Sequence, residues 1–135
     1  MPVAPEPDEF TAPFWDALRD GRLDVPECGA CGRRFFVPEP LCPHCGAAGW
    51  TWAHSPGTGT IYSMSVVHQA VDPAQPTPFV LAAVDLDDGW TLMTHIIDAD
   101  PDDVRIGARV VVRPTRLTDE ITVPTFALEP LTETR

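Results

Sequence analysis

The chain has 135 residues and an ordinary apolar fraction of 44%, which suits one domain, or a compact module with a small satellite, and excludes a disordered chain. It carries 20 acidic against nine basic residues, and the net charge of −11 disfavours nucleic acid and anionic membranes as partners. The N-terminus lacks the features of a signal peptide, and no apolar stretch approaches the ~20 residues of a membrane span. We therefore expect a cytoplasmic protein with reduced thiols.

Residues 1–24 predict an N-terminal arm followed by a short helix over residues 11–20. Thr11 is a suitable cap, Pro13 suits the first turn, and Gly21 ends the helix. A helix this short is marginal alone, so its apolar face must pack either on its own domain or on a partner protein. In the partner interpretation, the docking anchors are Phe10, Phe14, Trp15 and Leu18.

Residues 25–54 hold all four cysteines, in two C-x-x-C pairs that are each followed by glycine. Such turns present two sulfurs to one ion, and glycine permits the positive φ that aims N–H groups at sulfur. Four thiolates complete the tetrahedron that zinc prefers and leave no open position for catalysis. We expect a rubredoxin-like zinc ribbon with structural Zn²⁺, while iron in a redox site and two disulfides are the alternatives. The ligands are Cys28, Cys31, Cys42 and Cys45.

Residues 55–135 change to a β pattern. Runs rich in apolar and β-branched residues predict five strands, over residues 60–67, 79–86, 90–97, 109–113 and 122–128. Asp88-Gly89 predicts a hairpin turn, and Pro124 makes the last strand an edge strand or a bulged one. The predicted fold class is mainly β: a short N-terminal helix, a zinc ribbon and a five-stranded OB-fold barrel, although a small open sandwich would produce the same pattern.

No catalytic set is apparent. If the metal takes all four cysteines, no thiol remains as a nucleophile. The four histidines are scattered singly among turns and strands; we expect His44 to be a turn residue, and His68 and His95 to be surface or internally satisfied residues. The acidic pair Asp87-Asp88 falls in a predicted turn, and we expect both carboxylates to be solvated.

The order of several segments resembles domain-of-unknown-function family 35, also described as OB-fold acyl-CoA-associated proteins with a rubredoxin-like zinc ribbon. The resemblance runs from about residue 9 to residue 128, and it rests on the two cysteine pairs together with Pro13-Phe14-Trp15, Gly21-Arg22-Leu23, residues 57–63, residues 83–89 and residues 106–110. Members of that family accompany thiolase-fold enzymes. The resemblance implies a non-catalytic accessory subunit in a hetero-oligomer, supporting retro-aldol cleavage of a β-hydroxyacyl-CoA such as a steroid side chain, or thiolase-type acyl transfer.

The same resemblance implies that the chain has no catalysis alone but is a component of a lyase (aldolase) or acyltransferase complex, with a coenzyme A thioester as ligand. Arg33 and Arg34 are candidates to grip the phosphates of CoA, and ordinary surface arginines are the alternative. Two other functions stay open. One is a nucleic-acid-binding zinc-ribbon/OB module, and the other is a rubredoxin-like electron carrier.

Overall fold

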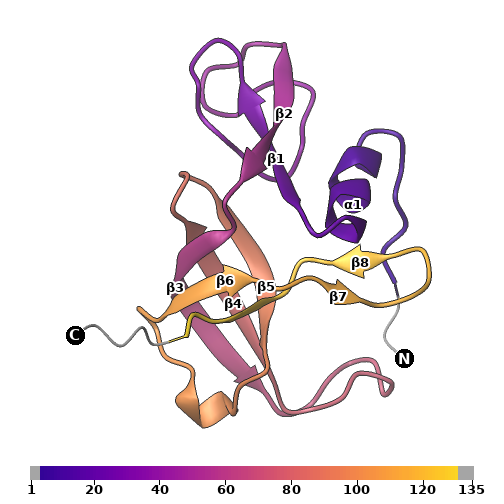
Figure 1. Ribbon diagram of the computed structural model, residues 1–135, viewed down its shortest axis with the longest axis vertical. Coiled ribbons are helices and arrows are strands. Elements are labelled where there is room, and N and C mark those ends of the chain that lie inside the picture. The colour runs from indigo at the N-terminus through magenta and orange to yellow at the C-terminus, as the bar shows by residue number, and fades with distance from the viewer. Residues whose placement is uncertain (1–3, 131–135) are drawn as a thin grey trace.

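A computed structural model describes residues 4–130 of the chain (Figure 1). A helix, α1 (Ala12–Arg19), leads into a two-stranded ribbon formed by β1 (Leu23–Cys28) and β2 (Trp50–Ser55). A closed barrel follows. Figure 1 shows the ribbon standing on one end of the barrel, with α1 beside the base of the ribbon. No helix among the described residues is long and apolar enough to cross a membrane.

The helix has the expected position, and Thr11 is its N-cap residue, as predicted. The Thr11 side chain, however, makes no capping hydrogen bond to the helix backbone. The Thr11 hydroxyl instead accepts from Trp15 Nε1 at 3.2 Å, and the Thr11 N–H donates to Asp8 at 2.8 Å. Thr11 thus links the Trp15 side chain of the helix to Asp8 of the preceding arm.

The ribbon is built by pairing of distant segments. β1 and β2 are antiparallel, with Leu23 opposite Ser55 and Cys28 opposite Trp50. Between the two strands, Arg34 makes an isolated bridge to Glu27 of β1. Phe35 adds one backbone hydrogen bond of 3.1 Å to the carbonyl of Pro26 and then turns into a small core with Cys28 and Cys42.

The predicted OB-type barrel is confirmed. Its strands are hydrogen-bonded in the closed order β3-β4-β5-β9-β6, in which β9 is parallel to β5 and every other neighbour is antiparallel. Pairing of β6 with both β9 and β3 closes the sheet, which excludes the open sandwich. The barrel strands are β3 (Thr58–Val67), β4 (Phe79–Leu86), β5 (Thr91–Ile97), β6 (Arg109–Val112) and β9 (Phe126–Leu128).

The last predicted strand is divided at Pro124. The part before the proline is β8 (Thr122–Val123), which pairs with β7 (Thr115–Arg116) outside the barrel, and the part after it is β9. Proline has no N–H for a ladder, so a break at this position follows from its chemistry. The β7–β8 hairpin projects toward α1 (Figure 1), and α1 and β8 contact one another. A 3₁₀ turn, η1 (Pro101–Asp103), lies between β5 and β6.

One hydrophobic core joins the three parts of the chain. Phe14 and Leu18 of α1 and Leu23 and Val25 of β1 are buried in the same cluster as the barrel interior, which includes Phe126. Burial of this apolar surface holds the helix and the ribbon base on the barrel. The expected division into residues 1–24, 25–54 and 55–135 stays a prediction.

Candidate metal centre and groove

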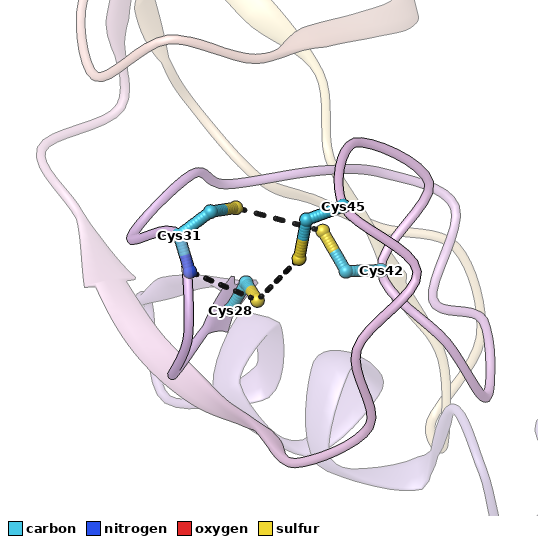
Figure 2. A group of neighbouring side chains, drawn as sticks. All are labelled: Cys28, Cys31, Cys42 and Cys45. Atoms are coloured by element: carbon cyan, nitrogen blue, oxygen red, sulfur yellow. Dashed lines mark hydrogen bonds between the residues drawn. The ribbon is translucent and has the colours of Figure 1, made fainter.

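The four cysteine sulfurs converge at the end of the ribbon (Figure 2) and all lie within 4.8 Å of one another. Cys28 Sγ is 3.6 Å from Cys45 Sγ, and Cys31 Sγ is 3.8 Å from Cys42 Sγ. Four sulfurs placed about 2.3 Å from a tetrahedral zinc ion would be separated by about 3.8 Å. These distances are far beyond the ~2.05 Å of a disulfide. The set therefore fits Zn²⁺, with every coordination position filled by protein.

The two C-x-x-C turns with their following glycines, residues 28–32 and 42–46, are called knuckles here and have similar backbone geometry. Cys28 accepts at sulfur from the N–H groups of Ala30 and Cys31, at 3.3 and 3.4 Å, and Cys42 accepts from the N–H of His44 at 3.4 Å. The glycine after each pair has positive φ, +75° at Gly32 and +80° at Gly46, as expected from the sequence. Since an N–H aimed at sulfur stabilises a thiolate, the backbone is arranged for metal-bound cysteine.

The thiols differ in acidity. The pKa of Cys28 is lowered to about 6, because the backbone N–H groups of Cys31 and Ala30 donate to its sulfur. The pKa of Cys45 is raised to about 11; a hydrogen bond from the Ala47 N–H lowers it, but the neighbouring Cys28 sulfur and burial outweigh that effect. Zinc binds thiolates, so loading this site with the ion releases protons.

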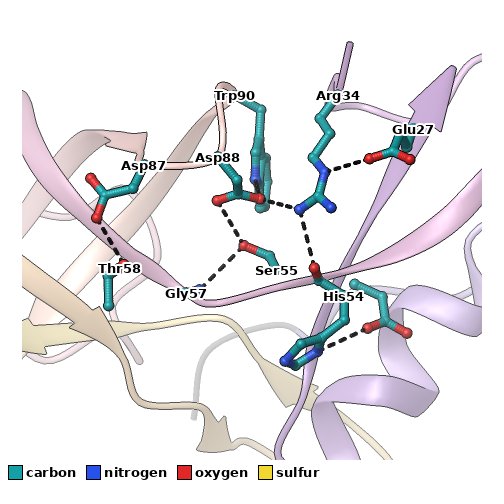
Figure 3. Close-up of polar contacts among 10 residues, drawn as sticks. Glu27, Arg34, His54, Ser55, Gly57, Thr58, Asp87, Asp88 and Trp90 are labelled. Atoms are coloured by element: carbon teal, nitrogen blue, oxygen red, sulfur yellow. Dashed lines mark hydrogen bonds and ion pairs between the residues drawn. The ribbon is translucent and has the colours of Figure 1, made fainter. Parts of the chain in front are cut away.

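A polar network joins the ribbon to the barrel (Figure 3). Asp88, in the β4–β5 turn, accepts from Arg34 Nη1 at 2.6 Å, from Trp90 Nε1 at 2.8 Å and from the Ser55 hydroxyl at 3.1 Å. Arg34 also donates to Glu27 at 3.0 Å. The expectation that Asp88 is solvated was therefore wrong, because folding brings an arginine 54 positions away in the sequence onto its carboxylate.

An open groove of about 610 Å³ lies on the outer face of β5. Outward-facing side chains of β5 form its floor, residues of α1 form one wall, and the β7–β8 hairpin forms another. Met93, His95 and Ile97 face outward, alternating with residues of the barrel interior. Within the part of the chain that the structure describes, no Asp, Glu, Lys or Arg lines this groove.

The four predicted interface residues differ in their exposure to solvent. Phe14 and Leu18 are 2% and 1% exposed and belong to the core. Phe10 is 40% exposed and packs edge-on against Trp50, and Trp15 is partly exposed at the rim of the groove. An interface role for this set stays a prediction; the accessible members are Phe10 and Trp15.

The two predicted CoA-binding arginines have different surroundings. Arg34 is held by Glu27 and Asp88, with only 19% of its side chain exposed. Arg33 is exposed and makes no ion pair with any residue in the described range. A CoA contact stays a prediction for both, and only Arg33 has a guanidinium that is accessible without breaking an ion pair.

Two of the histidines have defined surroundings. His95 stacks on Phe79 with ring centroids 4.6 Å apart, and burial lowers the pKa of its imidazole. His54 lies 3.7 Å from Asp24 at the ribbon base. The groove and the role of Asp88 are the features that the sequence did not reveal. Apolar residues at the outward positions of β5, Met93 and Ile97, were an available signal of the groove.

Comparison with known proteins identifies both parts of the chain. Residues 15–51 match a family model described as the rubredoxin-like zinc ribbon domain of ChsH2, and residues 52–114 match the C-terminal OB-fold domain of ChsH2. A solved structure described as Ltp2-ChsH2(DUF35) aldolase is similar with a TM-score of 0.83 and 35% identity, over 92% of this chain and 98% of that one. A DUF35 protein of unknown function from Sulfolobus solfataricus, 16% identical, has the same fold with a TM-score of 0.61 over 90% of this chain and 89% of that one.

Three curated relatives have informative names. A probable enoyl-CoA hydratase alpha subunit of Thermomonospora curvata is 38% identical over 84% of this chain and 36% of its own length. The 3-oxo-4,17-pregnadiene-20-carboxyl-CoA hydratase alpha subunit of Mycobacterium tuberculosis is 31% identical over 80% and 34%. A DUF35 domain-containing scaffold protein of Methanothermobacter thermautotrophicus is 35% identical over 62% and 65%. This chain thus spans about a third of either hydratase subunit. It belongs to the DUF35 family, with the zinc ribbon and OB-fold domains of the ChsH2 type.

Proposed function

We propose that this chain is a non-catalytic accessory subunit that binds a thiolase-fold enzyme and supports its acyl-CoA chemistry. The reaction of the complex would be retro-aldol cleavage of a β-hydroxyacyl-CoA, such as a steroid side chain, or thiolase-type acyl transfer. The observation that carries the proposal is the similarity over 92% of the chain to a structure named as a DUF35 aldolase. Two further relatives are named as subunits of acyl-CoA hydratases, which supports the same substrate class.

The chemistry of the chain's own residues supports an accessory role. The four sulfurs satisfy a metal ion completely, so the metal has no position for water or substrate. Among the described residues, no nucleophile is hydrogen-bonded to a base in the arrangement that covalent catalysis needs. The reacting groups are therefore assigned to the partner enzyme.

The surface offers places for a partner. Apolar side chains are exposed around α1 and the groove: Phe10 is 40% exposed, Val37 60% and Met93 61%. Contiguous exposed apolar surface is typical of a binding face. We assign the partner contact to Phe10 and Trp15, and the contact with CoA phosphate to Arg33, because Phe14, Leu18 and Arg34 are already engaged within the chain.

Nucleic-acid binding has less support. OB folds bind oligonucleotides on the face of their second and third strands, here β4 and β5, with the adjoining loops. That binding requires cationic side chains beside stacking aromatics. The groove on this face has no cation among the described residues that line it. An oligonucleotide would therefore find no counter-charge where an OB fold ordinarily binds it.

Affinity purification tests the proposal. Tagged full-length protein isolated from its native host is expected to retain a near-stoichiometric thiolase-like protein, identified by mass spectrometry. Phe10→Ser is expected to weaken this capture, whereas Tyr62→Ser, which also removes an exposed aromatic side chain, 67% exposed on β3, is expected to leave it unchanged. A monomeric protein that retains no thiolase-like chain would contradict the proposal.

A further inference from the structure

The groove occupies the ligand-binding side of an OB fold but has the wrong chemistry for the usual ligands. It lies over β5 and is bordered by the loop that carries Gln75 and by the segment between β6 and β9. These elements correspond to the strand face and loops with which OB folds bind oligonucleotides and oligosaccharides. Oligonucleotides need cations and sugars need many unpaired polar groups. This groove is instead lined mostly by apolar and aromatic side chains, among them Trp15, Met93 and Leu117.

The threonine hydroxyls and the indole N–H that line the groove are already hydrogen-bonded within the chain. Thr94 Oγ1 donates to the carbonyl of Pro124 at 2.7 Å, and the hydroxyls of Thr115 and Thr125 are 2.6 Å apart. The Trp15 indole N–H donates to Thr11. A ligand in this groove therefore contacts mainly aliphatic and aromatic side chains, and few groups of the groove need a hydrogen bond from it. An uncharged apolar molecule loses the least hydration on entering such a surface.

His95, on the groove floor, differs from these hydroxyl and indole groups. Its ring lies flat against Phe79 on the groove floor, with an interplanar angle of 26°, and its nitrogens have no hydrogen-bond partner among the described residues. Burial lowers the pKa of this imidazole, so it is neutral at neutral pH. A neutral imidazole offers one donor and one acceptor. It is therefore suited to a single carbonyl or hydroxyl group of an otherwise apolar ligand.

We propose that the groove binds the uncharged, apolar acyl portion of the thioester substrate, and that His95 hydrogen-bonds an oxygen carried by that portion. This inference rests on the proposed function and assigns one ligand to this chain. The volume of about 610 Å³ is within the range of roughly 300–1,000 Å³ that is typical of small-molecule sites. The CoA moiety, with its phosphates, must lie outside the groove, because no cation lines it in the described part of the chain.

Binding to the zinc-loaded full-length chain tests the site directly. Progesterone, a neutral steroid ketone, and 2-tridecanone, a flexible ketone, are titrated while backbone amide resonances are recorded. The expected result is saturable binding of at least one probe, with shifts concentrated at residues 92–97 and 115–125 and small shifts at residues 28–45. The stronger probe identifies whether the acyl portion is polycyclic or a straight chain.

Three variants locate the contacts. Met93→Glu puts a carboxylate on the groove floor at a 61% exposed position and is expected to weaken ketone binding more than about tenfold. Tyr62→Glu, at a 67% exposed position outside the groove, is the matched control and is expected to have no effect. His95→Phe keeps the stacking surface but removes the hydrogen bond, and is expected to weaken ketone binding about fivefold. It should leave binding of pyrene, which has no oxygen, unchanged.

Failure of this inference is distinguishable from failure of the proposed function. If neither ketone binds, or if the shifts lie in the ribbon, the groove is not an acyl site, whatever partner the chain captures. If neither ketone binds and Met93→Glu abolishes capture of the thiolase-like protein, the groove is a protein interface. This result would contradict the acyl site but would support the proposed accessory function. If the ketones bind but no partner is retained, the site stands as a ligand site of the chain alone.

Discussion

Arg34 Nη1 lies 2.6 Å from Asp88 Oδ2, and this ion pair joins the zinc ribbon to the β4–β5 turn of the barrel. Only 19% and 14% of the two side chains are exposed. The same carboxylate accepts hydrogen bonds from the Trp90 indole and the Ser55 hydroxyl (Figure 3). Asp88 therefore connects a residue of the barrel core, the end of β2 and the ribbon. The orientation of the metal centre on the barrel therefore depends on a contact that neither part makes alone.

Removal of Asp88 is expected to destabilise the protein. Asp88→Ala leaves Arg34 and the Trp90 N–H without their shared acceptor, and hydrogen bonds to a charged group contribute roughly 1.5–3 kcal/mol each. We expect the free energy of unfolding, measured in urea, to fall by about 2–4 kcal/mol. The exposed pair of Arg116 and Asp119, 69% and 96% exposed, is the control. Asp119→Ala is expected to change stability by less than about 0.5 kcal/mol, and equal effects at the two sites would contradict this interpretation.

Chelation of the metal is expected to unfold the knuckles selectively. The distal ribbon has a small core of its own, formed by Cys28, Phe35 and Cys42, whereas Leu23 and Val25 at its base pack in the barrel core. After complete removal of zinc, amide protection should be lost over residues 28–50 and retained in β3–β5. Native protection of the knuckles without metal would contradict the prediction. Metal analysis and colour distinguish zinc from iron, since an oxidised iron–sulfur site of this kind is red.

The Asp87–Arg109 pair predicts acid sensitivity. Arg109 donates to both carboxylate oxygens, at 2.8 and 2.6 Å, and Thr58 adds a hydrogen bond of 2.8 Å. The side-chain hydrogen bonds from Arg109, first, and from Thr58 lower the pKa of Asp87 from 3.8 to about 2. A depressed pKa stabilises the fold above the unfolded value, and this contribution is lost as the pH falls from about 4 toward 2.

Asp87→Asn tests this dependence. The variant is expected to unfold at lower urea than the unmodified chain at pH 7, and the difference should shrink as the pH falls through the range between 4 and 2. Added salt should also reduce the difference at pH 7, since both side chains are about 45% exposed. A difference that is the same at pH 7 and pH 2 would show that Asp87 acts through something other than its charge.

The predicted interface set should separate into residues that maintain the fold and residues that bind. Leu18→Ala removes a side chain that is 1% exposed, and such cavities cost about 2–5 kcal/mol. Phe10→Ala, at a 40% exposed position, should cost less stability but should reduce capture of the partner. Thermal unfolding and affinity purification of both variants check the separation. If Leu18→Ala protein is shown to be folded but no longer captures the partner, the interface lies on the face of α1 that carries Leu18.

The sequence was sufficient where the signal is local. The cysteine spacing and following glycines predicted a four-sulfur site, and the structure places all four sulfurs within 4.8 Å. Alternating strands with a turn at Asp88-Gly89 predicted the barrel, and the bounds of β4 agree with the predicted residues 79–86. Pro124 predicted an edge strand or a bulge, and the structure divides the strand at this residue. Each of these features depends on residues close together in the chain.

By itself, the sequence determined the ligand set of the metal, the strands of the barrel and the membership of a family. Only the tertiary structure decided which aromatic side chains face the core, that Asp88 is bonded to Arg34, and that β5 and the β7–β8 hairpin enclose a groove with α1. The physical reason is sequence distance. A turn or a knuckle is specified by a few adjacent dihedral angles and side chains, whereas burial, ion pairing and a cavity wall depend on segments many tens of residues apart meeting in space.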